Sequence, residues 1–111
     1  MKISLKSVLL DLRGVPIMDE GQPAMLGLVC VKALTATIAG ETLPGEKKFE
    51  RWMIAKRIYD AAQADLDPVE FSVQEVALLK ELTGKIYGTE VVGSIWALFE
   101  SAKIGAQPGE A

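Results

Sequence analysis

Apolar and polar residues alternate at the start of the chain in a pattern that is typical of β-strands. Residues 3–12 place apolar side chains on both sides of an extended segment. The sequence "DLRG" then supplies a tight turn, because Asp11 can accept a backbone hydrogen bond and Gly14 tolerates a positive φ. A proline in the returning segment "VPIM" suits an edge strand, which tolerates a residue without an N–H donor. We therefore predict a β-hairpin over residues 3–18.

Apolar residues recur at helical spacing in the rest of the chain. We expect four helices, over residues of about 24–39, 46–64, 73–87 and 90–103. The first is apolar over a wide arc, which predicts a mostly buried helix. The apolar side of the second is expected to be formed by Phe49, Trp52, Met53, Ile58, Tyr59 and Ala62. The third begins with the signature of a capping box, made by Ser72 and Glu75.

These elements together predict the fold class. A lone hairpin is marginal in water and must pack on other elements. We therefore expect an α+β domain, mostly α, in which an N-terminal β-hairpin packs on about four helices. Residues 1–104 should form one compact domain, since 111 residues suffice for a single modest core. The tail, residues 105–111, lacks apolar periodicity and is expected to be disordered.

Charge and composition exclude several classes of function. The formal net charge of −3 argues against general affinity for nucleic acid or anionic membranes. No apolar stretch approaches the ~20 residues that span a bilayer, and none has the form of a secretory signal, so we expect a soluble protein of the cytoplasm. Cys30 is the single cysteine, which rules out an intramolecular disulfide. Its apolar surroundings predict a buried, structural thiol.

The residues needed for the common catalytic sites are missing. The chain has no histidine, which removes Ser-His and Cys-His pairs, His-ligated zinc and the commonest general base. The Gly-Lys pair at 84–85 is not part of a phosphate loop, since Leu79 stands where that motif needs glycine. The acidic run over 65–70 fails as an EF-hand loop, whose sixth and twelfth positions would be Glu70 and Val76. Its acids are better explained by the dipole of the helix that follows. We predict no enzymatic activity, no metal and no cofactor.

A DNA-binding helix-turn-helix over residues 73–100 is also disfavoured. The second helix of that motif must present polar and basic side chains to the major groove. Here the second helix is mostly apolar and carries Glu90 and Glu100 near its ends. It is therefore interpreted as a packing helix.

The segment 46–64 carries the best candidate for a binding surface. Basic residues of this segment and the two tryptophans of the chain are the candidate partner-binding residues: Lys47, Lys48, Arg51, Trp52, Lys56, Arg57 and Trp96. Rim charges steer association, and Trp and Arg are enriched in interfaces. The simpler interpretation is a solvated basic helix face with both tryptophans packed in the core. Both interpretations stay open at the level of sequence.

Four stretches of the chain resemble a group of small proteins encoded by tailed bacteriophages: "LLDLRGVPI", "LGLVCVKALTA", "EKKFERWMIAKRIYDA" and "FSVQEVALLKELTGKIYGTEVVGSIWALFE". The resemblance covers residues 3–100, and its motifs are structural, so it carries no functional residue over to this chain. Arg13 stands where the group usually has a small acidic or polar residue, which leaves the turn prediction unchanged.

The resemblance implies an accessory protein without enzymatic activity that acts through protein–protein contacts in virion assembly. Its place would be at the head, neck or tail, for example as a tail-assembly chaperone or a connector component, and such proteins often self-associate. The partner would be a phage structural protein, and the location the host cytoplasm or the virion itself. The alternative is a phage regulator that binds and inhibits a host protein.

Overall fold

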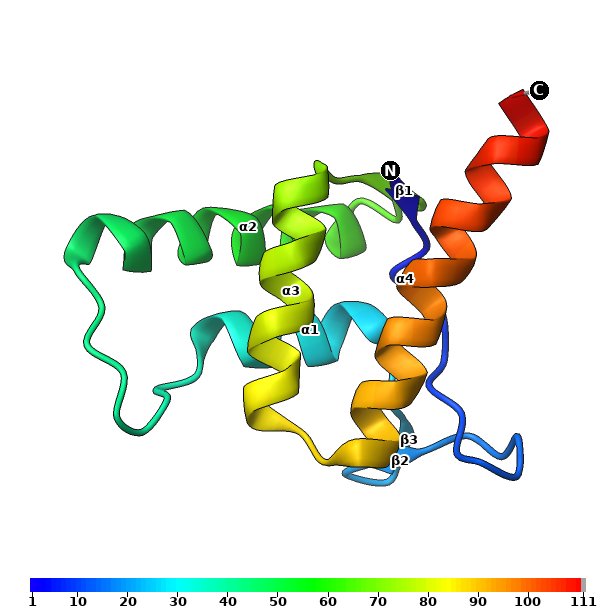
Figure 1. Cartoon of the computed structure of the whole chain (residues 1–111), viewed down its shortest axis with the longest axis horizontal. Helices are drawn as coiled ribbons and strands as arrows, with labels where there is room; N and C mark the ends of the chain where they lie inside the picture. The colour runs from blue at the N-terminus through cyan, green and yellow to red at the C-terminus, as the bar shows by residue number, and fades with distance from the viewer. Residues whose placement is uncertain (111) are drawn as a thin grey trace.

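Helices make up most of the molecule. The computed structural model describes the backbone of residues 1–110 and the side chains of residues 1–102. Over that range it contains α1 (Leu26–Thr35), α2 (Gly45–Gln63), α3 (Val73–Ile86) and α4 (Thr89–Glu110). The helix α1 packs against both α2 and α3, and α3 packs against α4. Figure 1 shows that α3 crosses α1 and α2, with α4 beside it.

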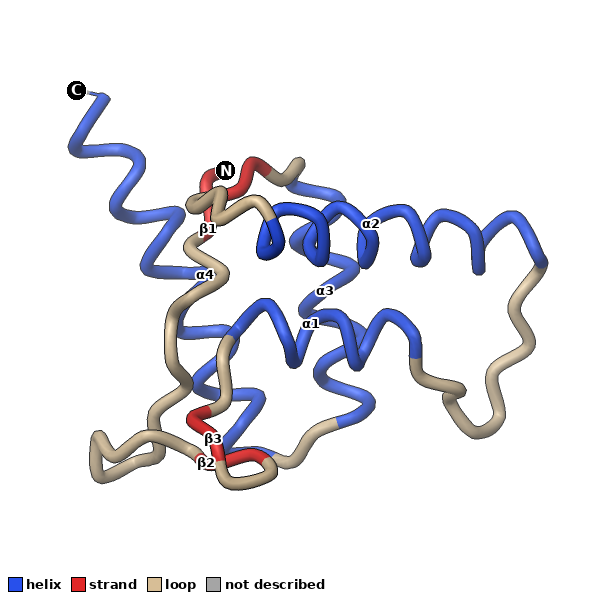
Figure 2. The backbone as a smooth tube through the Cα atoms, turned by 180° about the vertical axis from the view of Figure 1, so that it is seen from behind, coloured by secondary structure: helices blue, strands red, loops and turns tan. Residues whose placement is uncertain are grey.

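Two very small antiparallel sheets complete the fold. The strand β1 (Lys2–Ile3) pairs with β4 (Val69–Glu70), and β2 (Met18–Asp19) pairs with β3 (Gln22–Pro23). The tube in Figure 2 shows these strands as short pieces at two separate places around the helices. The predicted fold class, a mostly helical α+β domain with a small N-terminal β element, is confirmed.

The N-terminal hairpin is smaller than the predicted span 3–18. An isolated bridge joins Leu10 to Pro16, and the Ile17 N–H donates to the Leu9 carbonyl at 2.8 Å. The first residues of the chain leave this hairpin and pair with β4 instead. A second tight hairpin, β2–β3, follows directly, and it turns through residues 20 and 21 at positive φ. The chain therefore forms two short turns where the sequence predicts one longer hairpin.

The turn at 11–14 has the geometry that its residues suggest. The Gly14 N–H donates to the Asp11 carbonyl at 2.9 Å, and Gly14 has a φ of +81°. The Asp11 carboxylate accepts from the N–H groups of Arg13 and Val15 at 2.8 and 3.0 Å. These bonds, that from Val15 above all, hold the pKa of Asp11 below its usual range. "DLRG" is thus a tight turn.

The core lies between α1 and the other helices. Its largest fully buried side chains, with Cys30 among them, are Phe71, Phe99, Ile3, Leu9, Leu26, Leu79, Leu82, Ile95 and Thr83. The burial of Cys30 raises the pKa of its thiol to about 12, as expected for a structural cysteine. The Thr83 hydroxyl donates to the Leu79 carbonyl at 2.7 Å, so this buried polar group is satisfied.

The ends of α3 and α4 differ in how closely they follow the sequence pattern. At the start of α3, Ser72 Oγ accepts from the Glu75 N–H at 3.1 Å, and the Glu75 carboxylate accepts from the Ser72 N–H at 2.8 Å. These two bonds form a capping box. The helix α4 runs on to Glu110, past the predicted end at 103 and through most of the predicted tail, whose last residue, 111, lies outside the described residues.

Candidate protein-binding surface on α2

The helix α2 turns large apolar side chains toward solvent. Its buried side consists of Arg51, Ile54, Ala55, Ile58 and Ala61. Of the six residues predicted to form its apolar side, only Ile58 is buried. The side chains of Phe49, Trp52, Met53 and Tyr59 are between 52% and 59% exposed. This corrects the prediction for the orientation of α2.

The correction has a simple packing reason. The helix α1 comes close to α2, and a Cβ atom on Gly27 would lie 3.6 Å from Ile58 Cγ2. Small side chains favour such a close approach, and the buried side of α2 includes Ala55 and Ala61 beside Ile58. Apolar spacing alone does not distinguish this stripe from the aromatic one on the opposite side.

Arg51 belongs to the interior rather than to an exposed basic face. It is 9% exposed, and its guanidinium donates to both carboxylate oxygens of Glu41 at 2.8 and 3.0 Å. These hydrogen bonds hold the pKa of Glu41 below its usual range and raise that of Arg51. The pair fixes the loop between α1 and α2 to the side of α2. Arg51 also lines the groove between α2 and α3 that is described below, so its role in partner binding stays a prediction.

Most of the other basic side chains of α2 are paired with carboxylates. Lys47 lies 3.3 Å from Glu50, Lys56 lies 3.0 Å from Asp60, and Arg57 lies 2.9 Å from Glu75. Arg57 also stacks over the Phe71 ring, 4.9 Å from its centroid, and Lys48 is exposed. The surface of α2 is therefore a mixture of both charges around apolar side chains.

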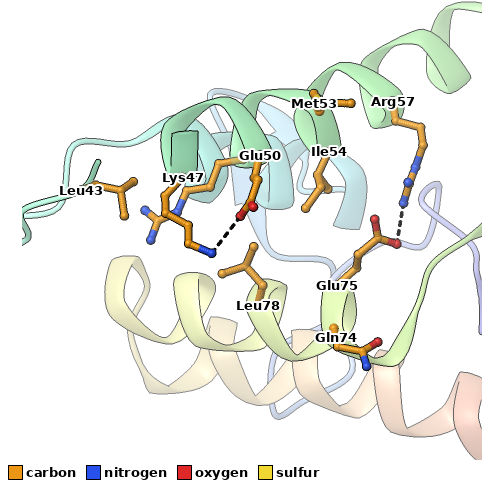
Figure 3. Close-up of a pocket in the computed structure, with 10 residues that line it drawn as sticks. Leu43, Lys47, Glu50, Met53, Ile54, Arg57, Gln74, Glu75 and Leu78 are labelled. Carbon is orange, nitrogen blue, oxygen red and sulfur yellow. Dashed lines mark hydrogen bonds and ion pairs between the residues drawn. The ribbon is translucent and has the colours of Figure 1, made fainter. Parts of the chain in front are cut away.

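A groove lies between α2 and α3. It has a volume of about 660 Å³, and its apolar lining comes from Leu43, Met53, Ile54 and Leu78. Figure 3 shows the Lys47–Glu50 pair at one end and the Arg57–Glu75 pair at the other. The geometry suits an apolar side chain or a short apolar segment held between two polar ends.

Sequence reasoning missed the α3 side of this groove. On the α3 side the groove is lined by Gln74, Glu75 and Leu78. Leu43 lines it from the loop that precedes α2. The capping box of Ser72 and Glu75 was visible in the sequence, but the second partner of Glu75, Arg57, was not. The angle at which α2 and α3 cross cannot be predicted from the spacing of apolar residues along either helix.

Trp96 lies on a different surface. It is 43% exposed on α4, and the Lys80 ammonium lies 5.0 Å from the centroid of its ring. Trp52 stacks on Phe49, with their ring centroids 5.9 Å apart. Neither tryptophan is a core residue, which corrects the simpler interpretation of both. The structure does not bring Trp96 into the groove with the α2 residues.

The acidic segment before α3 holds the N-terminal residues of the chain in place. Asp67 accepts from the Ser4 hydroxyl at 2.6 Å and from the Leu5 N–H at 2.7 Å. Asp65 pairs with Lys6, and Glu70 with the amino group of Met1. Among residues whose side chains are described, no group of three or more His, Cys, Asp or Glu is arranged to hold a metal ion. The acidic residues that suggest a metal site in the sequence therefore form tertiary contacts with the N-terminal residues.

Comparisons with known proteins add no relative. The chain matches no protein-family model, and searches of curated proteins and of solved structures gave no match. Within the described range, none of the helices has the length and apolar character needed to cross a membrane. The functional argument therefore starts from the surfaces described above.

Proposed function

We propose that this chain is a non-enzymatic bacteriophage protein that binds another protein during assembly of the virion. The observation that carries the proposal is the groove between α2 and α3, with Met53 exposed at its edge and Leu78 in its lining. Exposed apolar side chains gathered around a groove are typical of protein-binding surfaces. The virion setting is supported by the resemblance of residues 3–100 to small proteins of tailed phages.

The shape and chemistry of the groove favour an amphipathic helix as the bound segment. Such a helix places apolar side chains at i, i+3 and i+4 into an apolar groove. Met53, Ile54 and Leu78 would contact those side chains. The pairs Lys47–Glu50 and Arg57–Glu75 at the two ends of the groove would meet polar groups of the partner. Because each end carries both charges, the partner needs no strong net charge of its own.

Affinity capture from cells infected with the corresponding phage tests this function. We expect the tagged chain to recover a capsid, neck or tail protein in stoichiometric amounts. The variant Met53→Asp should recover at least about fivefold less, since placing a charge against the apolar lining of the bound groove costs more than about 1 kcal/mol. The matched control is Leu12→Asp, which alters a residue 94% exposed at the hairpin turn and should leave recovery unchanged.

Two results would contradict the proposal. Recovery of a single host protein in place of virion proteins would favour the alternative, a phage regulator that inhibits a host enzyme. Equal recovery by the Met53→Asp variant and the unmodified chain would show that the groove is not the binding site.

A further inference from the structure

The first half of α2, residues 45–53, is attached to the rest of the molecule by few buried side chains. All of these residues are described, and Arg51 alone among them is buried. The other buried residues of α2 lie from position 54 onward and are Ile54, Ala55, Ile58 and Ala61. Figures 1 and 2 show the first half of the helix extending past α3. Apolar burial therefore fixes mainly the second half of α2.

The beginning of α2 also lacks a side-chain cap. Its N-cap residue is Pro44, whose side chain accepts no hydrogen bond from the first turn. The N–H groups of Lys47 and Lys48 both donate to the Pro44 carbonyl, at 3.0 and 3.1 Å. Helices shorter than about 12 residues are marginal in water when isolated. Residues 45–53 therefore need a contact with another part of the molecule to remain helical.

One ion-pair network supplies this contact. The Arg51 guanidinium donates to both carboxylate oxygens of Glu41, and the Lys85 ammonium lies 3.9 Å from the same carboxylate. Since Lys85 belongs to α3, Glu41 links the first half of α2 to α3 through the loop between α1 and α2. Within the part of the chain whose side chains are described, no other side chain of residues 45–53 forms a hydrogen bond or an ion pair outside α2.

Open space borders the first half of α2 in two places. One is the groove of about 660 Å³ between α2 and α3. The other is a hollow of about 510 Å³ beside the loop that precedes α2, with Leu34 and Trp52 in its lining. Both spaces are lined by Leu43 and Arg51, so the loop and this arginine form the wall between them. Few packed neighbours therefore oppose an outward movement of residues 45–53.

From these observations we propose that residues 45–53 form a flap, which opens by local unwinding while the rest of the molecule stays folded, and that Glu41 is the latch that holds it closed. Local opening occurs where few buried apolar contacts must be broken. In the open flap both Arg51 and Glu41 reach water, so hydration offsets the loss of their pairing. The flap carries Lys47, Glu50 and Met53 of the groove lining, so its opening removes one wall of the groove.

Hydrogen exchange of the backbone amides measures this opening in the free protein. The amides of residues 50–53 should exchange at least about tenfold faster, after correction for intrinsic rates, than those of residues 79–83 in α3, which include the buried Leu79, Leu82 and Thr83. Low concentrations of urea should hardly change the rates at 50–53, because unwinding the flap exposes little surface. The same urea should accelerate exchange in α3, where opening requires global unfolding.

Two variants test the latch. Glu41→Gln leaves the Arg51 charge without its counter-ion in the closed state, so exchange at residues 50–53 should be at least about tenfold faster than in the unmodified chain. The amides of α3 should still exchange more slowly than those of the flap, which shows that the variant is folded. The matched control is Asp60→Asn, which removes the exposed Lys56–Asp60 pair of the same helix. It should change the rates at 50–53 by no more than about twofold.

Either of two results would overturn the proposal. Equal protection and equal urea dependence of residues 50–53 and of α3 would show that the flap opens only with global unfolding. Unchanged exchange at 50–53 in Glu41→Gln would show that Glu41 is not the latch. Because the measurement requires no bound partner, neither result depends on whether the groove binds a virion protein.

Discussion

Gly14 occupies a backbone conformation that side chains with a Cβ rarely adopt. Its φ is +81°, and no atom lies within 4 Å of the position that a Cβ would take. A substitution there is therefore opposed by backbone strain and not by a clash. We expect Gly14→Ala to lower the free energy of unfolding by about 1 kcal/mol, measured by urea denaturation.

Gly93 provides a control, in which the same replacement of glycine by alanine should change the free energy of unfolding in the opposite direction. It lies within α4, where a Cβ would also meet nothing within 4 Å. Alanine is the better helix former by about 1 kcal/mol, so Gly93→Ala should raise the free energy of unfolding. A neutral Gly14→Ala variant would contradict the turn geometry.

The Arg51–Glu41 pair makes stability depend on pH. The folded state lowers the pKa of Glu41, chiefly through the hydrogen bonds from Arg51. The unfolded state then binds more protons, so the contribution is present above the unfolded pKa and is lost as pH falls through the folded one. We expect the urea midpoint to fall on acidification below about pH 4.5, the region where unfolded glutamate titrates. In Glu41→Gln that fall should be smaller.

Other carboxylates share this direction, so the comparison with the unmodified chain is essential. The pKa values of Asp11, Asp65 and Glu75 are also lowered by their hydrogen bonds. Glu41→Gln removes only one of these contributions. An identical pH dependence in the variant and the unmodified chain would show that the pair does not act in this way.

Residue-level features were predictable where the signal is local. The turn formed by Asp11 and Gly14 spans four residues, and so does the capping box of Ser72 and Glu75. Both can therefore be predicted from neighbouring residues in the sequence. Arg51 is held inward by its hydrogen bonds to Glu41. The sequence pattern did not predict the path of the loop that contains Glu41. Charge counts along the helix could not show that this arginine turns inward.

At the scale of elements, α1 depends on a close approach to the N-terminal segment. A Cβ on Gly27 would lie 3.1 Å from Leu5 Cβ and 3.3 Å from the Leu5 carbonyl oxygen. That oxygen also accepts a 2.9 Å hydrogen bond from the Gly27 N–H, so the segment cannot move away freely. We expect Gly27→Ala to be at least about 1 kcal/mol less stable than Gly93→Ala, because overpacking offsets the gain in helix propensity.

Urea denaturation of the two variants side by side checks this expectation. Both replace a helical glycine by alanine, so helix propensity cancels in the comparison. Equal stabilisation by both substitutions would mean that Leu5 gives way without cost.

The elements themselves were largely predictable, but their partners were not. Four helices follow from apolar spacing, since each is a local pattern of 3.6-residue period. The strand β1 pairs with β4 near residue 70. This pairing is supported by the hydrogen bonds that the acidic segment accepts from Ser4 and Leu5. The same limit applies to α2, where two apolar stripes compete and only the contact with α1 decides which one is buried.

At the scale of the whole molecule, Cys30 reports on cooperativity. It is fully buried in α1, and burial raises the pKa of its thiol to about 12. The helix α1 packs against both α2 and α3. A thiol reagent therefore reaches Cys30 only when this central helix is uncovered, and uncovering it disrupts the contacts that hold the other helices together.

We expect the free energy of opening, measured by thiol labelling, to equal the free energy of unfolding from urea denaturation. The labelling should be done at about pH 8, where an exposed thiol with a pKa near 8.5 reacts readily. Agreement of the two values would establish that residues 1–104 unfold as one cooperative domain. If labelling required much less free energy, α1 would open without global unfolding, and the prediction of a single cooperative unit would be wrong.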